Sequence, residues 1–89
     1  MKPHFELGEI IITREAADRL VSGDVMKALR RHAAGDWGDV YPNEPLENRV
    51  CLDYGLAVQA VYRDSKGTEF HVYTEEDRTK TKVTLLDEY

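Results

Sequence analysis

The chain has 89 residues, of which 42% are hydrophobic and 33% are charged, and its formal net charge is -5. This length supports one domain (residues 1–89) with a single core, and the apolar content excludes a wholly disordered chain. The acidic excess excludes binding of nucleic acid through a generally basic surface, although a local basic stripe could still bind phosphate.

The first predicted element is a short strand within FELGEIIIT (5–13). The consecutive isoleucines Ile10 to Ile12 suit a strand better than a helix, because β-branched residues favour extended backbone. We expect this strand to belong to the sheet or to cover it. Thr13 is then predicted to cap a helix that ends near Ser22–Gly23. Its apolar residues recur at helical spacing: Ala16, Ala17, Leu20 and Val21.

A second helix is predicted from the cap Asp24 to the terminator Gly35. Its apolar stripe comprises Val25, Met26, Leu29 and Ala33. A glycine directly after a helical run adopts the left-handed conformation that ends helices, so Asp36 is expected to lie beyond the helix that carries His32. A short third helix is predicted between the cap Asn43 and the terminator Gly55.

From Leu56 the apolar period becomes two residues, which predicts strands. The DSKG segment at 64–67 has the composition of a hairpin turn, and a second turn is expected at 74–78. In the last strand Lys80 and Lys82 share the face opposite Thr81, Val83 and Leu85. The predicted fold class is therefore α+β: a short N-terminal strand, two to three helices, and a three-stranded antiparallel meander packed against the helices.

His32 is a candidate general base, because the unperturbed pKa of histidine lies near neutrality. The alternative is a helix-end histidine that bonds the last carbonyl groups, an arrangement that the helix dipole favours. One histidine beside a turn brings no partner geometry of its own, so the structural role is preferred.

Asp36 and Asp39 flank Trp37 and Gly38, and two carboxylates this close could bind a cation or act as acid and base. The residues that follow supply no further side-chain ligands, so no metal site is expected. We expect the aspartates to cap backbone amides while Trp37 fills the core or a groove. An exposed Trp37 would instead indicate a partner surface.

Arg78, Lys80 and Lys82 repeat at every second residue and are predicted to form one basic line along a strand face. Such a line can follow a phosphate backbone. The alternative is that these are lysines of an edge strand, which prevent sheets from aggregating. The preceding turn is expected to be held by a contact of Arg78 with Asp77 or Glu75.

The only cysteine, Cys51, cannot form an internal disulfide and has no cysteine or histidine at metal-ligand spacing, which favours a reducing cytoplasm. No stretch approaches the roughly 18 apolar residues of a membrane span, and the first residues lack the apolar block of a signal peptide. Sequence motifs of hydrolases and redox enzymes are absent. We therefore expect a cytoplasmic protein without a cofactor and without membrane contacts.

Two longer motifs, HAAGDWGD (32–39) and TEEDRTKTKVTLLDEY (74–89), together with Asn48 and the Tyr62–Arg63 pair, resemble a family of short bacterial, phage and plasmid proteins. The family pattern is approximately H-x-x-G-D-W-G-D and, near the C-terminus, T-E-x-D-R-x-x-T-x-x-L-L-P-x-E-Y. The sequence departs from this pattern at Thr84, in the position of the first leucine of the L-L pair. Members carry labels such as hypothetical or plasmid-related protein. The resemblance thus implies a mobile-element setting and does not imply catalysis.

The leading functional prediction is a non-enzymatic module that binds a protein partner through the Trp37 loop and the C-terminal strand. Its predicted binding residues are His32, Asp36, Trp37, Asp39, Arg78, Lys80 and Lys82. The alternative is a small toxin-like ribonuclease or RNA-binding domain that uses the basic stripe, by analogy with the order of helices and strands in such toxins. Its candidate residues are His71, Tyr73, Arg78 and Thr81. A monomer or a self-associating homodimer fits either function, with edge strands or tyrosine-rich faces as the means of association.

Overall fold

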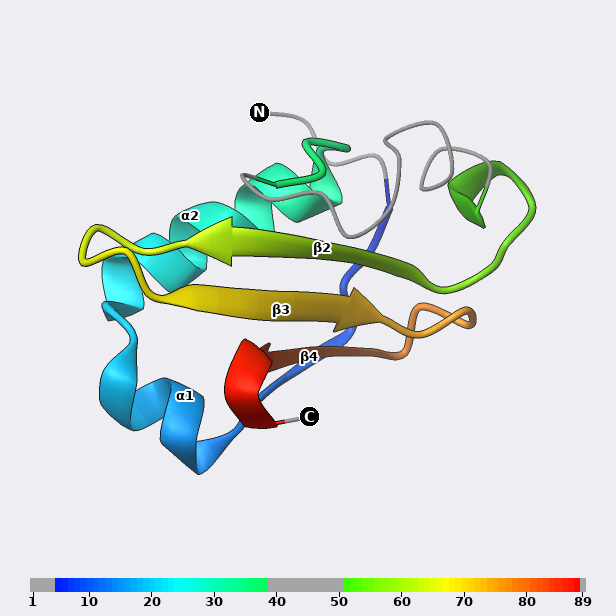
Figure 1. Ribbon diagram of the computed structural model, residues 1–89. Helices are drawn as coiled ribbons and strands as arrows, with labels where there is room; N and C mark the ends of the chain where they lie inside the picture. Colours follow the sequence, from blue (N-terminus) through cyan, green and yellow to red (C-terminus); the bar gives the residue numbers. More distant parts are fainter. Residues whose placement is uncertain (1–4, 39–50, 89) are drawn as a thin grey trace.

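The computed structural model describes residues 5–38 and 51–88 of the chain. The elements follow the predicted order: β1 (Glu9–Ile12), α1 (Arg14–Arg19), α2 (Ser22–Ala33), β2 (Val58–Arg63), β3 (Glu69–Thr74), β4 (Lys80–Leu85) and the 3-10 helix η1 (Leu86–Glu88). The strands lie side by side, and α1 and α2 follow one another along one side of the sheet (Figure 1). The predicted α+β class is confirmed.

Among the described residues the sheet has four strands in the order β1-β4-β3-β2, and it is mixed. β2, β3 and β4 form the predicted antiparallel meander, whereas β1 pairs with β4 in parallel, with Ile10 opposite Thr81 and Ile12 opposite Val83. The N-terminal strand therefore belongs to the sheet. β4 lies inside the sheet, so the interpretation of Lys80 and Lys82 as edge-strand lysines is wrong.

The two-residue period places alternate residues of each strand on the face that packs against the helices. Ala16 and Leu20 of α1 and Val25, Ala28 and Leu29 of α2 belong to the same core cluster as the sheet residues. The buried sheet residues of this cluster are Ala60, Tyr62, Phe70, Val72, Val83 and Leu85. The predicted alternation is confirmed from Val58, the first residue of β2, while Leu56 precedes the strand. Both helices thus cover the same face of the sheet.

The start of α1 matches the prediction, because the Thr13 hydroxyl accepts a hydrogen bond from the Ala16 N–H at 3.2 Å. The predicted end at Ser22–Gly23 is wrong, as is the predicted cap Asp24, because all of these residues lie in the first turn of α2.

The start of α2 is bound instead to the distant β2–β3 hairpin. The Asp24 carboxylate accepts a hydrogen bond from the Ser65 N–H at 2.8 Å, and the Val21 N–H donates to the Asp64 carboxylate at 3.2 Å. These partners lie far along the chain, so the local spacing of the sequence could not reveal them.

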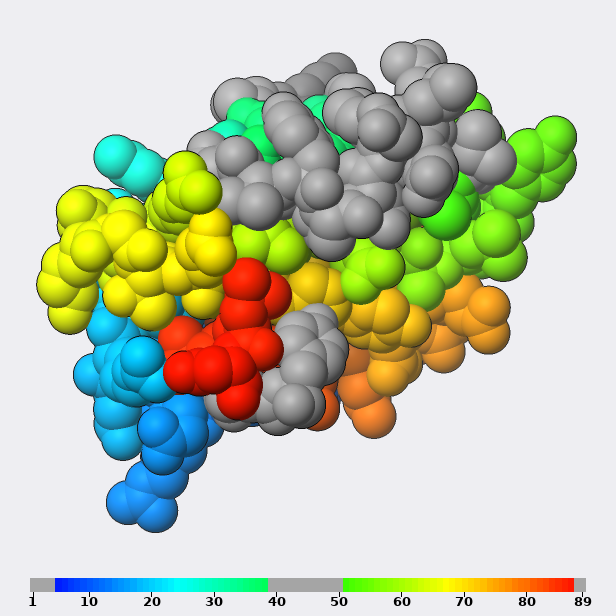
Figure 2. Space-filling view, viewed as in Figure 1, coloured from blue at the N-terminus to red at the C-terminus, as the bar shows by residue number. Residues whose placement is uncertain are grey.

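The predicted hairpin turn at 64–67 is confirmed, and Asp64 organises it. One carboxylate oxygen of Asp64 accepts hydrogen bonds from the N–H groups of Lys66 and Thr68, at 3.0 and 2.9 Å. The C-terminal η1 lies beside β3 and this hairpin (Figure 2). Asp87 of η1 forms an ion pair with Arg19 of α1 at 3.2 Å. The hairpin and η1 thus pack at the same end of the sheet.

The third predicted helix, from Asn43, lies mostly outside the described residues. Its last turn is described at residues 51–53, and Gly55 follows with a φ of 69°, as expected for a terminator. Within the described ranges, no helix is both long enough and apolar enough for a membrane span.

Candidate functional site

The loop after α2 (residues 35–38, here the clasp loop) carries two of the predicted site residues, Asp36 and Trp37. Gly35 has a φ of 83° and ends the helix as predicted. The Asp36 carboxylate accepts two hydrogen bonds from the Arg31 guanidinium, at 2.8 and 3.1 Å. The Asp36 carbonyl accepts a hydrogen bond from the Tyr62 hydroxyl at 2.6 Å, so the loop is bound to both α2 and β2.

Gly38 brings the clasp loop into backbone contact with β2. It forms a parallel bridge with Val61, and its φ is 103°. A Cβ atom at this position would lie 2.3 Å from the Val61 carbonyl oxygen. Close packing against the sheet therefore explains why the second glycine of the HAAGDWGD motif, Gly38, has no side chain.

Trp37 points inward from the clasp loop, and only 8% of its surface is exposed. Its ring stacks on Phe5 with centroids 6.2 Å apart and meets the edge of His32 at 5.8 Å. The expectation that Trp37 fills the core is confirmed. The side chain consequently offers little surface to a partner.

His32 is fully buried and belongs to a line of polar groups that joins α2 to the sheet. Its Nε2 lies 3.0 Å from the Thr74 hydroxyl, which lies 2.8 Å from the Thr81 hydroxyl. The Thr81 hydroxyl donates to the Leu7 carbonyl at 2.7 Å. Because each hydroxyl has one proton, Thr74 donates to Thr81, and Nε2 of His32 must carry the proton that it donates to Thr74.

The remaining nitrogen of His32, Nδ1, has no hydrogen-bond partner in the described part of the chain. Burial, with smaller effects from His71 and Arg78, lowers the pKa of His32 to about 3. The ring is therefore neutral at physiological pH and has no access to solvent. Both predictions for His32 are wrong: it cannot exchange a proton with a substrate, and it does not bond the carbonyl groups that end its helix.

Asp39 lies outside the described residues, so the expectation that it caps a backbone amide falls outside the described part of the chain. Within residues 5–38 and 51–88, no group of three or more histidine, cysteine, aspartate or glutamate side chains is arranged to hold a metal ion.

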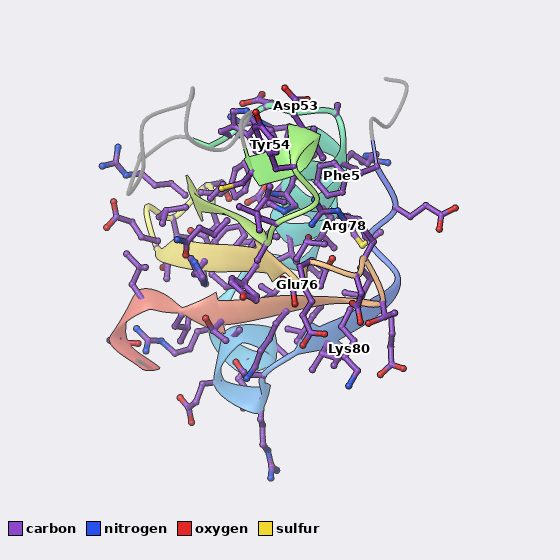
Figure 3. All side chains as sticks on the ribbon, turned by 90° about the vertical axis from the view of Figure 1, so that its right-hand side faces the viewer. Phe5, Asp53, Tyr54, Glu76, Arg78 and Lys80 are labelled. Atoms are coloured by element: carbon purple, nitrogen blue, oxygen red, sulfur yellow. The ribbon has the colours of Figure 1, made fainter. Side chains whose placement is uncertain are left out.

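Arg78 lies in the turn before β4 and not on the predicted basic line. Its φ is 61°, its guanidinium lies over the Phe5 ring at 5.3 Å, and it donates to the Glu75 carbonyl oxygen at 3.0 Å. Figure 3 shows the Arg78 and Lys80 side chains pointing in opposite directions. The prediction of one line through Arg78 is wrong. The contact that Arg78 makes within the turn is with the backbone carbonyl oxygen of Glu75.

The face of the sheet opposite the helices holds a cavity of about 510 Å³. All four strands contribute to its lining, which includes Ile11, Gln59, His71, Tyr73, Lys80 and Lys82. We call the surface formed by these six residues the helix-free face, because no helix of the described part of the chain belongs to the lining. A cavity of this size is typical of binding sites for small ligands or single side chains.

The helix-free face combines exposed charge with aromatic surface. Lys80 and Lys82 are exposed, as is 37% of Tyr73. His71 is buried beside Tyr73, with ring centroids 6.1 Å apart, and its Nε2 donates to the side-chain oxygen of Gln59 at 2.7 Å. Burial lowers the pKa of His71, which favours the neutral ring. The face can therefore offer two ammonium groups and an aromatic surface to a partner that carries negative charge.

Two residues of this face, Ile11 and Gln59, were not among the predicted site residues. The two-residue period of β2 and β3 could have placed Gln59 beside Tyr73, its partner in the antiparallel register. No local signal could have placed Ile11 there, because its position depends on the parallel pairing of β1 with β4.

Comparison of the chain with models of protein families, with curated proteins and with solved structures found no match. The resemblance of the two sequence motifs to plasmid and phage proteins therefore stays a prediction.

Proposed function

We propose that this protein is a non-enzymatic interaction module that binds a protein partner on the helix-free face. The supporting observation is that α1 and α2 pack against the same face of the sheet, which leaves Tyr73, Lys80 and Lys82 directed away from the helices. In this proposal the lysines of β4 meet acidic groups of the partner, and a partner side chain enters the cavity. The C-terminal strand keeps its predicted role, whereas the buried Trp37 supports the domain from within.

The charge around the cavity favours a protein over a nucleic acid. Glu75 lines the same cavity as Lys80 and Lys82, and Glu9 lies opposite Lys80 in the register of β1 and β4. A net charge of -5 adds repulsion against a phosphate backbone. Tyrosine is enriched in protein interfaces.

Single-stranded RNA is the second candidate, because Tyr73 and His71 offer rings beside two lysines. The catalytic set of a toxin-like ribonuclease has less support. Thr81 is fully buried on the helix side of the sheet, and Arg78 lies over Phe5. We therefore retain RNA binding as the second candidate, without cleavage of the RNA by these residues.

We place the module in the cytoplasm, because its single cysteine cannot form an internal disulfide. The motif resemblance supports a plasmid or phage setting. In that setting the partner is a protein of the mobile element or of its host.

The proposal is tested by capture from the native host, with tagged wild-type protein and a Lys80→Glu/Lys82→Glu variant. The control is Lys27→Glu/Lys66→Glu, which makes the same charge change at two other exposed lysines. We expect wild type and control to retain one protein partner after nuclease treatment, and the β4 variant to lose it. Retention by the β4 variant would contradict the proposal. Recovery of RNA that depends on Lys80 and Lys82, without a protein, would favour the second candidate.

A further inference from the structure

The two edges of the sheet end differently. At the β2 edge the clasp loop forms a bridge between Gly38 and Val61. At the opposite edge β1 is the last strand, and no strand of the described residues pairs with its outer side. An unpaired strand edge is a template for another strand.

The peptide groups of β1 show which residues face outward. The N–H groups of Glu9 and Thr13 donate to carbonyl oxygens of the β4 side of the sheet, at 2.8 and 3.1 Å. Peptide groups alternate in direction along a strand, so those of Ile10 and Ile12 point away from β4. The side chains of Ile10 and Ile12 are also exposed, at 39% and 40%. The outer edge of β1 thus offers hydrogen-bonding groups and apolar surface together.

We propose that a second copy of this chain occupies this edge, with the two β1 strands antiparallel about a two-fold axis at Ile11. In this register Ile10 lies opposite the partner's Ile12, and both residues have outward peptide groups that can bond each other. Ile11 then lies opposite the partner's Ile11 in a pair without hydrogen bonds. The exposed isoleucine side chains of the two copies cover each other on the helix side of the sheet.

The charges that flank β1 favour this antiparallel orientation. Glu9 begins the strand, and Arg14 follows shortly after its end. Antiparallel copies bring Glu9 of each chain near the partner's Arg14, whereas parallel copies would place like charges together. The charges of residues 9–14 are therefore complementary between two copies only when the copies run antiparallel. A two-fold interface requires this kind of self-complementarity.

The dimer would also join the two helix-free faces. Ile11 lines the cavity and lies on the axis, so the two cavities would be neighbours on one continuous sheet. This arrangement does not depend on the partner proposed above, and it can be tested without one.

Disulfide trapping tests the register. We expect Ile11→Cys, made in a Cys51→Ser background, to form a covalent dimer under mild oxidation, because facing residues of an antiparallel pair have the separation that a disulfide needs. The matched control is Ile12→Cys in the same background. Cys at this position faces the partner's Ile10 and should cross-link at least about tenfold more slowly. Equal rates for the two variants would overturn the proposed register.

Sedimentation tests the association itself. A small interface of this kind predicts a dimer fraction that grows between about 10 μM and about 1 mM protein. Ile10→Lys should stay monomeric over this range, because it places a charge at the edge. The control Leu56→Lys changes a residue of 47% exposure that precedes β2 at the other edge, and it should dimerise like wild type. A monomeric wild type at every concentration, or a dimeric Ile10→Lys with native circular dichroism, would overturn the proposal.

Discussion

Around the clasp loop, charged and aromatic side chains bind one another, whereas comparable side chains on the helix-free face point outward. Asp36 is held by Arg31, and Trp37 is held between Phe5 and His32. Lys80 and Lys82, by contrast, are exposed beside Tyr73. The densest motif of the sequence therefore specifies the fold, and the surface available for binding comes from strands of ordinary alternating composition.

Replacing one aromatic residue from each region should affect stability very differently. Trp37→Ala should destabilise the domain by about 3 to 5 kcal/mol, because it removes a buried ring from the core. Tyr73→Ala should cost under about 1 kcal/mol, since the tyrosine is partly exposed. Urea unfolding followed by circular dichroism measures both, because Trp37 is the only tryptophan and fluorescence would lose its reporter. Equal losses for the two variants would break the contrast between the regions.

A smaller effect is expected from the close approach of the clasp loop to β2. Gly38→Ala should cost about 2 to 3 kcal/mol, because the new Cβ meets the Val61 carbonyl oxygen in a backbone conformation that alanine disfavours. Gly23→Ala is the control. Nothing lies within 4 Å of its added Cβ, and alanine should stabilise α2 by about 0.5 to 1 kcal/mol. Melting temperatures should therefore shift in opposite directions. A Gly38→Ala protein as stable as wild type would contradict the bridge.

Lowering the pH should destabilise the folded protein through its buried histidines. The pKa of His32 is about 3 in the folded protein and about 6.5 in the unfolded chain, so the unfolded chain takes up a proton first as the pH falls. The contribution of neutral His32 to the free energy of unfolding is complete above about pH 7. It declines as the pH falls toward 3, and about 2 kcal/mol of it is lost by pH 5. Burial lowers the pKa of His71 as well, which adds a loss of the same sign.

Urea unfolding at pH 7 and pH 5 measures this loss. His71→Gln should keep the part that is due to His32, whereas His32→Gln should remove it at the cost of lower stability at pH 7. A His32→Gln variant with the pH dependence of wild type would show that the ring is not buried in neutral form.

Local chemistry explains what could be predicted from the sequence. Thr13 and Gly35 act through their own turns, the hairpin turn at 64–67 needs only its Asp64 and a glycine, and the alternation of β3 depends on its own residues. The features that could not be predicted depend on distant partners. Asp24 binds the hairpin, β1 pairs with β4, and Arg78 turns toward Phe5.

The same distinction between local and distant interactions applies to the residues of the candidate site. The helix end at Gly35 and the inward position of Trp37 were predictable, because a terminator glycine and a single large aromatic residue indicate packing on their own. The burial of His32 depends on Thr74 and Thr81 of two other strands, which no spacing around the histidine reveals.

The parallel pairing of β1 with β4 also determines when the sheet can form completely during synthesis. The first strand of the chain can join the sheet only after the last strand has left the ribosome. Pairing between segments this far apart in the sequence slows folding. Until that moment the isoleucines of β1 stay without their neighbour in the nascent chain, and exposed apolar segments of this kind are prone to aggregate.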